Sequence, residues 1–87
     1  MLSAVWMRQA QERFDRIISN RYSNVKSVSF NSLIRAYIDD INDNIHQYWD
    51  ELKWIDRSNA NISKLIIACF PNSYSIDSNR NYTLHLQ

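Results

Sequence analysis

One apolar pattern, between residues 34 and 55, constrains the fold of this chain more than any other feature. Its side chains recur at spacings of four, three, four, three, four and three, the period of one face of an α-helix. The pattern predicts a continuous helix of about 25 residues, ~37 Å long at the α-helical rise. The residues on this face, called the seam below, are Ile34, Ile38, Ile41, Ile45, Tyr48, Leu52 and Ile55.

The length of the chain conflicts with so long a helix. The 87 residues predict a single domain, residues 1–87. A domain of that size ordinarily has a radius of gyration of about 12 Å, so a helix ~37 Å long would extend beyond it. Either the seam continues onto a partner, or the helix breaks at residues 39–44, where five of six residues are Asp or Asn and each disfavours helix by ~0.5–0.7 kcal/mol. We expect a continuous helix, because the apolar phase does not slip across this acidic stretch.

The chain contains no glycine, which excludes several classes of active site. Phosphate-binding loops, dinucleotide fingerprints, nucleophile elbows and EF-hand loops use glycine where the backbone approaches a ligand or takes a positive φ. The single cysteine, Cys69, lies in an apolar run and is expected to be buried and inert. That run is far shorter than a membrane span, and no secretory signal is evident, so we expect a cytoplasmic protein that binds no membrane.

The remaining segments predict a mainly helical α+β fold of three helices, the second one long, followed by a C-terminal β-hairpin. The first helix covers residues 4–19 with Ser3 as N-cap, and Ser29 or Asn31 caps the second. Residues 62–70 form a third helix, started by Asn59 or Asn61, and the alternation of residues 74–76 and 82–86 is typical of a hairpin. This order also occurs in winged-helix proteins, and an all-α helical bundle is the alternative fold.

The acidic run in the middle of the seam raises the question of a metal site. The spacing of Asp39, Asp40 and Asp43 resembles the magnesium-binding motif of terpene and prenyl synthases, in which carboxylates three and four residues apart share a helix face. His46 and Asp50 extend the same face. The chain is too short to enclose a synthase cavity, so we expect a solvated acidic face, with no metal and no cofactor.

Charge is distributed unevenly along the chain although its net value is only +1. Residues 1–30 carry five basic and two acidic side chains, residues 31–56 two basic and six acidic, and residues 57–87 three basic and one acidic. A basic first helix and an acidic second helix are typical of an antiparallel helical hairpin, in which exposed ion pairs set the orientation.

The favoured function is a small, non-catalytic protein-interaction module of the inhibitor, immunity or adaptor type. A seam longer than the domain and aromatic residues beside it indicate a surface that binds a protein partner or a second copy of the chain. The expected protein-binding residues are Ile34, Ile38, Ile41, Ile45, Trp49, Leu52, Trp54 and Ile55.

A winged-helix regulator that binds nucleic acid is the first alternative. In such a protein the third helix enters the major groove while the hairpin touches phosphate. The few positive charges of the last 31 residues weigh against this role unless a dimer doubles them. The expected nucleic-acid-binding residues are Arg57, Asn59, Asn61, Lys64 and Arg80.

A ribonuclease is the second alternative, and the only enzyme among the three. The segment from Arg80 to His85 resembles the arginine, polar, three residues, histidine motif of the HEPN ribonuclease families. The resemblance implies that Arg80 stabilises phosphate and that His85 acts near the scissile bond. In those families the motif lies on a helix, whereas here the alternation predicts a strand.

Overall fold

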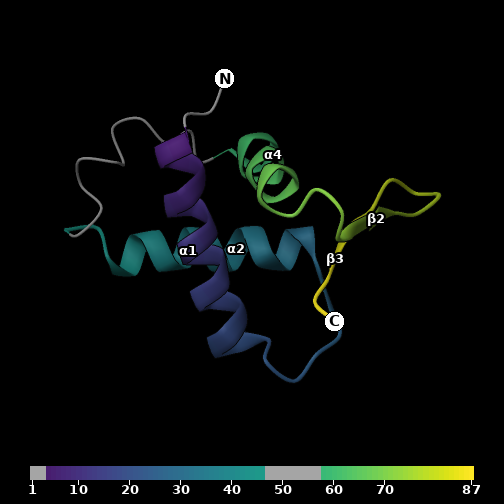
Figure 1. Cartoon of the computed structure of the whole chain (residues 1–87), viewed down its shortest axis with the longest axis horizontal. Coiled ribbons are helices and arrows are strands. Elements are labelled where there is room, and N and C mark those ends of the chain that lie inside the picture. Colours follow the sequence, from purple (N-terminus) through teal and green to yellow (C-terminus); the bar gives the residue numbers. More distant parts are fainter. Residues whose placement is uncertain (1–3, 47–57) are drawn as a thin grey trace.

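A computed structural model describes residues 4–46 and 58–87 of the chain. This part is mainly helical and contains three helices and a three-stranded antiparallel sheet, so the predicted α+β class is confirmed and the all-α alternative is wrong. In Figure 1, α1 crosses α2, α4 lies beside them, and the β2–β3 hairpin extends from one end of the molecule. The elements are α1 (Ala4–Arg21), β1 (Ser27–Ser29), α2 (Phe30–Asp43), α4 (Asn59–Cys69), β2 (Tyr74–Ile76) and β3 (Tyr82–His85).

The sheet has the strand order β1-β3-β2. The hairpin of β2 and β3 confirms the sequence prediction, with Tyr74 opposite Leu84 and Ile76 opposite Tyr82. Strand β1 pairs antiparallel with the other edge of β3 and places Val28 opposite Leu84. The sequence analysis predicted only two strands, so the third strand, which joins the start of α2 to the C-terminal hairpin, is an addition.

The second helix is shorter than the seam predicted. It ends at Asp43, where the backbone N–H of Asn44 donates to the carbonyl of Ile41 and its side-chain amide donates to the carbonyl of Asp40 at 2.8 Å. The prediction of an unbroken helix from residue 34 to residue 55 is therefore wrong. Asp and Asn have low helix propensity, and an Asn side chain can satisfy a backbone carbonyl that a further helical turn would otherwise engage.

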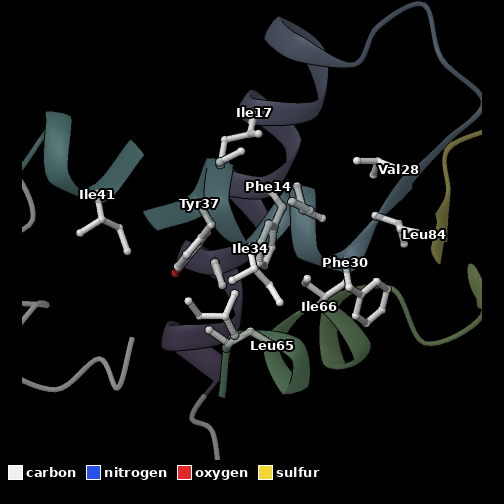
Figure 2. Packing of buried hydrophobic residues seen from close by; sticks show 14 residues of the cluster. Phe14, Ile17, Val28, Phe30, Ile34, Tyr37, Ile41, Leu65, Ile66 and Leu84 are labelled. Atoms are coloured by element: carbon white, nitrogen blue, oxygen red, sulfur yellow. The ribbon is translucent and has the colours of Figure 1, made fainter. Parts of the chain in front are cut away.

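One hydrophobic core joins all the described elements. The ring of Phe14 on α1 stacks on Tyr37 of α2 at a centroid distance of 4.7 Å and meets Phe70, at the end of α4, edge-on at 6.0 Å. Figure 2 shows these helices meeting around Ile34 and Ile66, with Val28 and Leu84 bringing the sheet against them. The fully buried large side chains are Phe14, Leu33, Tyr37, Ile41, Ile62, Ile66 and Leu84.

The charges of α1 and α2 are complementary, as expected, but the geometry differs from the prediction. Arg16 forms an ion pair with Asp40 at 2.7 Å, and Arg21 lies 4.0 Å from Asp39. The two helices cross in Figure 1, so the predicted antiparallel hairpin is wrong. Asp39 and Asp43 face solvent as expected, whereas Asp40 is half-buried and paired.

Serine residues start two of the helices. Ser29 caps α2 by accepting the N–H of Ser32 at 3.1 Å, which confirms one of the two predicted caps. Ser58, and neither Asn59 nor Asn61, caps α4 by accepting the N–H of Asn61 at 3.3 Å. The cap fixes where α4 begins and therefore which of its residues face outward.

The core predicts a large difference between substitutions of two isoleucines, one on α4 and one on β2. Ile66 is 0% exposed and Ile76 is 50% exposed. We expect Ile66→Ala to lower the free energy of unfolding by ~2–5 kcal/mol, because it removes buried methylenes and leaves a cavity. Ile76→Ala serves as the matched control and should cost less than about 1 kcal/mol in urea denaturation. Equal losses for the two variants would contradict the described packing.

Candidate nucleic-acid interface

Helix α4 turns one face to the core and the other to solvent. Ile62, Leu65 and Ile66 are buried against α1 and α2. Ala60 and Lys64, on the opposite side of the helix, are exposed, and Asn61 and Ser63 flank them half-buried. The outward face of α4, here defined as Ala60, Asn61, Ser63 and Lys64, is therefore open along the first two turns of the helix.

The asparagines at the start of α4 have side-chain amides with no partner in the described parts of the chain. Asn59 is exposed, and the only hydrogen bond of Asn61 outside the helical ladder is made by its backbone N–H. The asparagines beside the other turns differ, because Asn44 donates to a backbone carbonyl and Asn81 donates to Asp77. The amides of Asn59 and Asn61 can therefore bond to a ligand without breaking a hydrogen bond to residues 4–46 or 58–87.

The tip of the hairpin is organised around Asp77. Its Oδ1 accepts the N–H groups of Asn79 at 2.8 Å and Asn81 at 2.9 Å, and its Oδ2 accepts the side-chain amide of Asn81 at 3.3 Å. These bonds, led by the one from the backbone of Asn81, hold the pKa of the Asp77 carboxyl below its ordinary value. The turn is consequently a defined structure built by one carboxylate.

Arg80 occupies the position in this turn at which glycine is usual. Its φ of 62° lies in the left-handed region, which disfavours residues with a Cβ atom. Its N–H donates to the carbonyl of Asp77 at 3.0 Å, and its side chain is exposed. Because the hairpin projects beyond the helices in Figure 1, the turn holds a guanidinium group away from the body of the protein.

Acidic side chains are segregated from this part of the molecule. In residues 4–46 all the acids, Glu12, Asp15, Asp39, Asp40 and Asp43, lie on α1 and α2. In residues 58–87 the only acid is Asp77, whose carboxylate is bonded within the turn. Lys64 and Arg80 are exposed, and among residues 58–87 the one acid, Asp77, is bonded within its turn, which favours an anionic ligand at α4 and the hairpin.

The seam residues that were expected to bind a protein lie mostly in the core of the chain itself. Ile34 and Ile41 are buried and Ile38 is half-buried, while Ile45, just beyond α2, is 38% exposed. The described seam residues of α2 therefore pack on α1 and α4 within the chain. The other expected residues, Trp49, Leu52, Trp54 and Ile55, lie outside the described residues, as does Arg57 of the nucleic-acid set.

The two residues of the ribonuclease motif lie on the hairpin. Arg80 is in the turn and His85 is the last residue of β3, so the motif is not on a helix as in the HEPN families. The imidazole Nε2 of His85 lies 2.8 Å from the hydroxyl of Ser75 on β2. This cross-strand hydrogen bond gives His85 a structural role in the hairpin.

Two further expectations concern reactive groups and metals. Cys69 is half-buried, and burial raises the pKa of its thiol to about 11, so the thiolate is scarce at neutral pH. Among the described residues no group of three or more His, Cys, Asp or Glu side chains could hold a metal ion.

No helix in the described ranges is long and apolar enough to cross a membrane.

The sequence analysis named Asn59, Asn61, Lys64 and Arg80 but missed other features of this surface. Ala60 belongs to the outward face of α4, and its place opposite Ile62 and Ile66 could have been found from the helical period once the cap was assigned. The left-handed backbone of Arg80 had no clear signal in sequence, because arginine is not a residue typical of that conformation.

Comparison with protein-family models, with curated proteins and with solved structures finds no match for this chain. The fold and the chemistry of the surface therefore carry the functional argument.

The turn at Asp77 predicts a pH-dependent change at the tip of the hairpin. Because the folded pKa lies below the ordinary 3.8, the carboxylate supports the turn fully above pH 3.8, and this support is lost as the pH falls through the folded pKa. We expect NMR signals of the Asn79 and Asn81 amides to titrate with a midpoint below 3.8. Asp77→Asn should abolish this titration, and a wild-type midpoint at or above 3.8 would contradict the bonds described.

Proposed function

We propose that this chain is a winged-helix protein that binds duplex DNA, with α4 in the major groove and the β2–β3 hairpin on the flanking backbone. The observation that carries the proposal is the order helix, strand, helix, helix, strand and strand of the elements in residues 4–46 and 58–87, with the sheet order β1-β3-β2. In this arrangement the helix that enters DNA is followed directly by the hairpin that forms the wing. Here α4 leads into β2 through the turn at Pro71.

The shape of α4 supports this role. A B-DNA major groove about 12 Å wide admits one α-helix, and helix α4 has its inward face anchored by Ile62 and Ile66. The small side chains of Ala60 and Ser63 on its outward face leave the helix narrow enough to approach base edges. A rigid helix with a fixed start presents the same residues to DNA in each encounter.

Electrostatics set the expected strength of binding. Lys64 and Arg80 are the cations of α4 and the hairpin in the described part of the chain, and few phosphate contacts give weak non-specific affinity with a shallow dependence on salt. A second copy on the same duplex would double these contacts. Discrimination between DNA sequences must then come from contacts to base edges.

The proposal predicts the effect of removing each cation. We expect Lys64→Ala and Arg80→Gly each to weaken binding to all duplexes to a similar extent. Each should also reduce the slope of log K against log salt concentration by about 1, because one phosphate contact is lost. Fluorescence anisotropy with a labelled duplex over a salt series measures both quantities. Glycine is chosen at position 80 because it accepts the φ of 62° without strain.

Arg8→Ala is the matched control, since Arg8 is an exposed arginine on α1. It should leave both the affinity and the salt slope unchanged. Thermal melting of Arg80→Gly should show a fold at least as stable as the wild type, which separates loss of a phosphate contact from loss of structure. Absence of salt-dependent binding to any duplex by the wild-type chain would overturn the proposed function.

A protein-interaction role is the second candidate, and the exposure of Ile45 favours it. Ile45 is the one described member of the seam that faces solvent, and a contact between two copies through this side chain would bury it. We expect light scattering to detect self-association that Ile45→Asp weakens and Val25→Asp does not, since Val25 is similarly exposed. A strictly monomeric wild-type chain would contradict this role for Ile45.

A further inference from the structure

The side-chain types of helix α4 can be compared with those that pair with particular bases in protein–DNA complexes. Arginine is the commonest reader of guanine and carboxylates accept from cytosine, whereas asparagine pairs with adenine and methyl groups contact the methyl of thymine. The helix, from Asn59 to Cys69, contains no arginine and no acidic residue. It contains Asn59, Asn61 and Ala60 in its first turn. The groups present are those that suit an A·T pair.

The hydrogen bonding and exposure of these side chains support the same conclusion. The amides of Asn59 and Asn61 have no hydrogen-bond partner in the described ranges, and Ala60 between them is exposed. An amide that is free can donate to adenine N7 and accept from adenine N6 at once. An exposed methyl group beside it can contact the thymine of the same or a neighbouring pair.

Lys64 is the one cationic side chain of α4, and cationic side chains are the commonest donors to guanine. It lies one turn further along the outward face from Ala60, and its flexible ammonium group suits a phosphate as a point charge. Arg80 belongs to the hairpin, which in the proposed function touches the backbone. Neither cation therefore supplies a fixed, bidentate reader of guanine on the helix.

We infer that α4 selects duplex DNA containing A·T pairs at the centre of its site, with Asn61 bonding to adenine and Ala60 contacting the methyl of thymine. This inference rests on the proposed function, because it assumes that α4 lies in the major groove. Asn59 carries a second amide at the start of the helix, on a different side from Asn61.

The test compares duplexes of equal length and charge that differ only in the central base pairs, A·T in one and G·C in the other. We expect the wild-type chain to bind the A·T duplex roughly 5- to 150-fold more tightly, the range for one good base contact. Asn61→Ala should lower this ratio while leaving affinity for the G·C duplex nearly unchanged. A third duplex with uracil in place of thymine removes only the methyl groups and should weaken binding through Ala60.

The controls separate this inference from the proposed function. Asn20→Ala, at an exposed asparagine of α1, should leave the ratio unchanged, and Lys64→Ala should lower the affinity for both duplexes equally. Salt-dependent binding without preference, or preference for the G·C duplex, would overturn the A·T inference and leave the proposed function standing. No binding to either duplex would overturn both. If Asn61→Ala does not fold, the uracil duplex still tests the contact of Ala60 with the wild-type chain, and unchanged affinity for it would overturn that contact.

Discussion

The ring of Phe14 is the contact on which the arrangement of the helices depends. It stacks on Tyr37 of α2 and meets Phe70 at the end of α4, so one side chain of α1 touches both other described helices. Arg13, its neighbour in sequence, is buried and donates to the hydroxyl of Tyr37 at 3.3 Å. Burial raises the pKa of that hydroxyl, which therefore remains protonated and can itself donate. The position of α4, and with it the proposed interface, follows from this packing.

The helical periods predicted most of the core but misplaced the buried face of the second helix. On α1, Met7, Ala10, Phe14 and Ile17 recur at helical spacings, and all but the half-buried Met7 are buried. On α2 the seam residues Ile34 and Ile41 are buried and Ile38 is half-buried, whereas Leu33 and Tyr37, outside the seam, are fully buried. A period locates a face only to within the width of a side chain. The buried hydroxyl of Tyr37 needs a hydrogen-bond partner, and that partner, Arg13, lies on another helix and has no signal in the local sequence.

Local sequence was also a poor guide wherever a distant segment determines the structure. The hairpin was predictable because its two strands alternate and are close in sequence. Strand β1 has three residues and is stabilised by pairing with β3, more than 50 positions away along the chain. The end of α2 depends on a different balance, because apolar periodicity favoured continuation while the Asp and Asn residues favoured a stop. The low helix propensity of the Asp and Asn residues prevailed, because Asn44 caps the carbonyls of Asp40 and Ile41.

The left-handed backbone conformation of Arg80 at the hairpin tip favours a functional role for its charge. Asparagine tolerates the left-handed region better than arginine does, and Asn79 and Asn81 flank the position in which Arg80 takes it. The Asp77 carboxylate accepts hydrogen bonds from the N–H groups of Asn79 and Asn81. These bonds hold the backbone of Arg80 in the left-handed conformation against its intrinsic preference. A guanidinium group kept at an exposed tip despite that cost is expected where the tip meets an anion. The same reasoning joins the turn to α4, at the other end of the proposed interface, where Asn59 is exposed and Asn61 is half-buried.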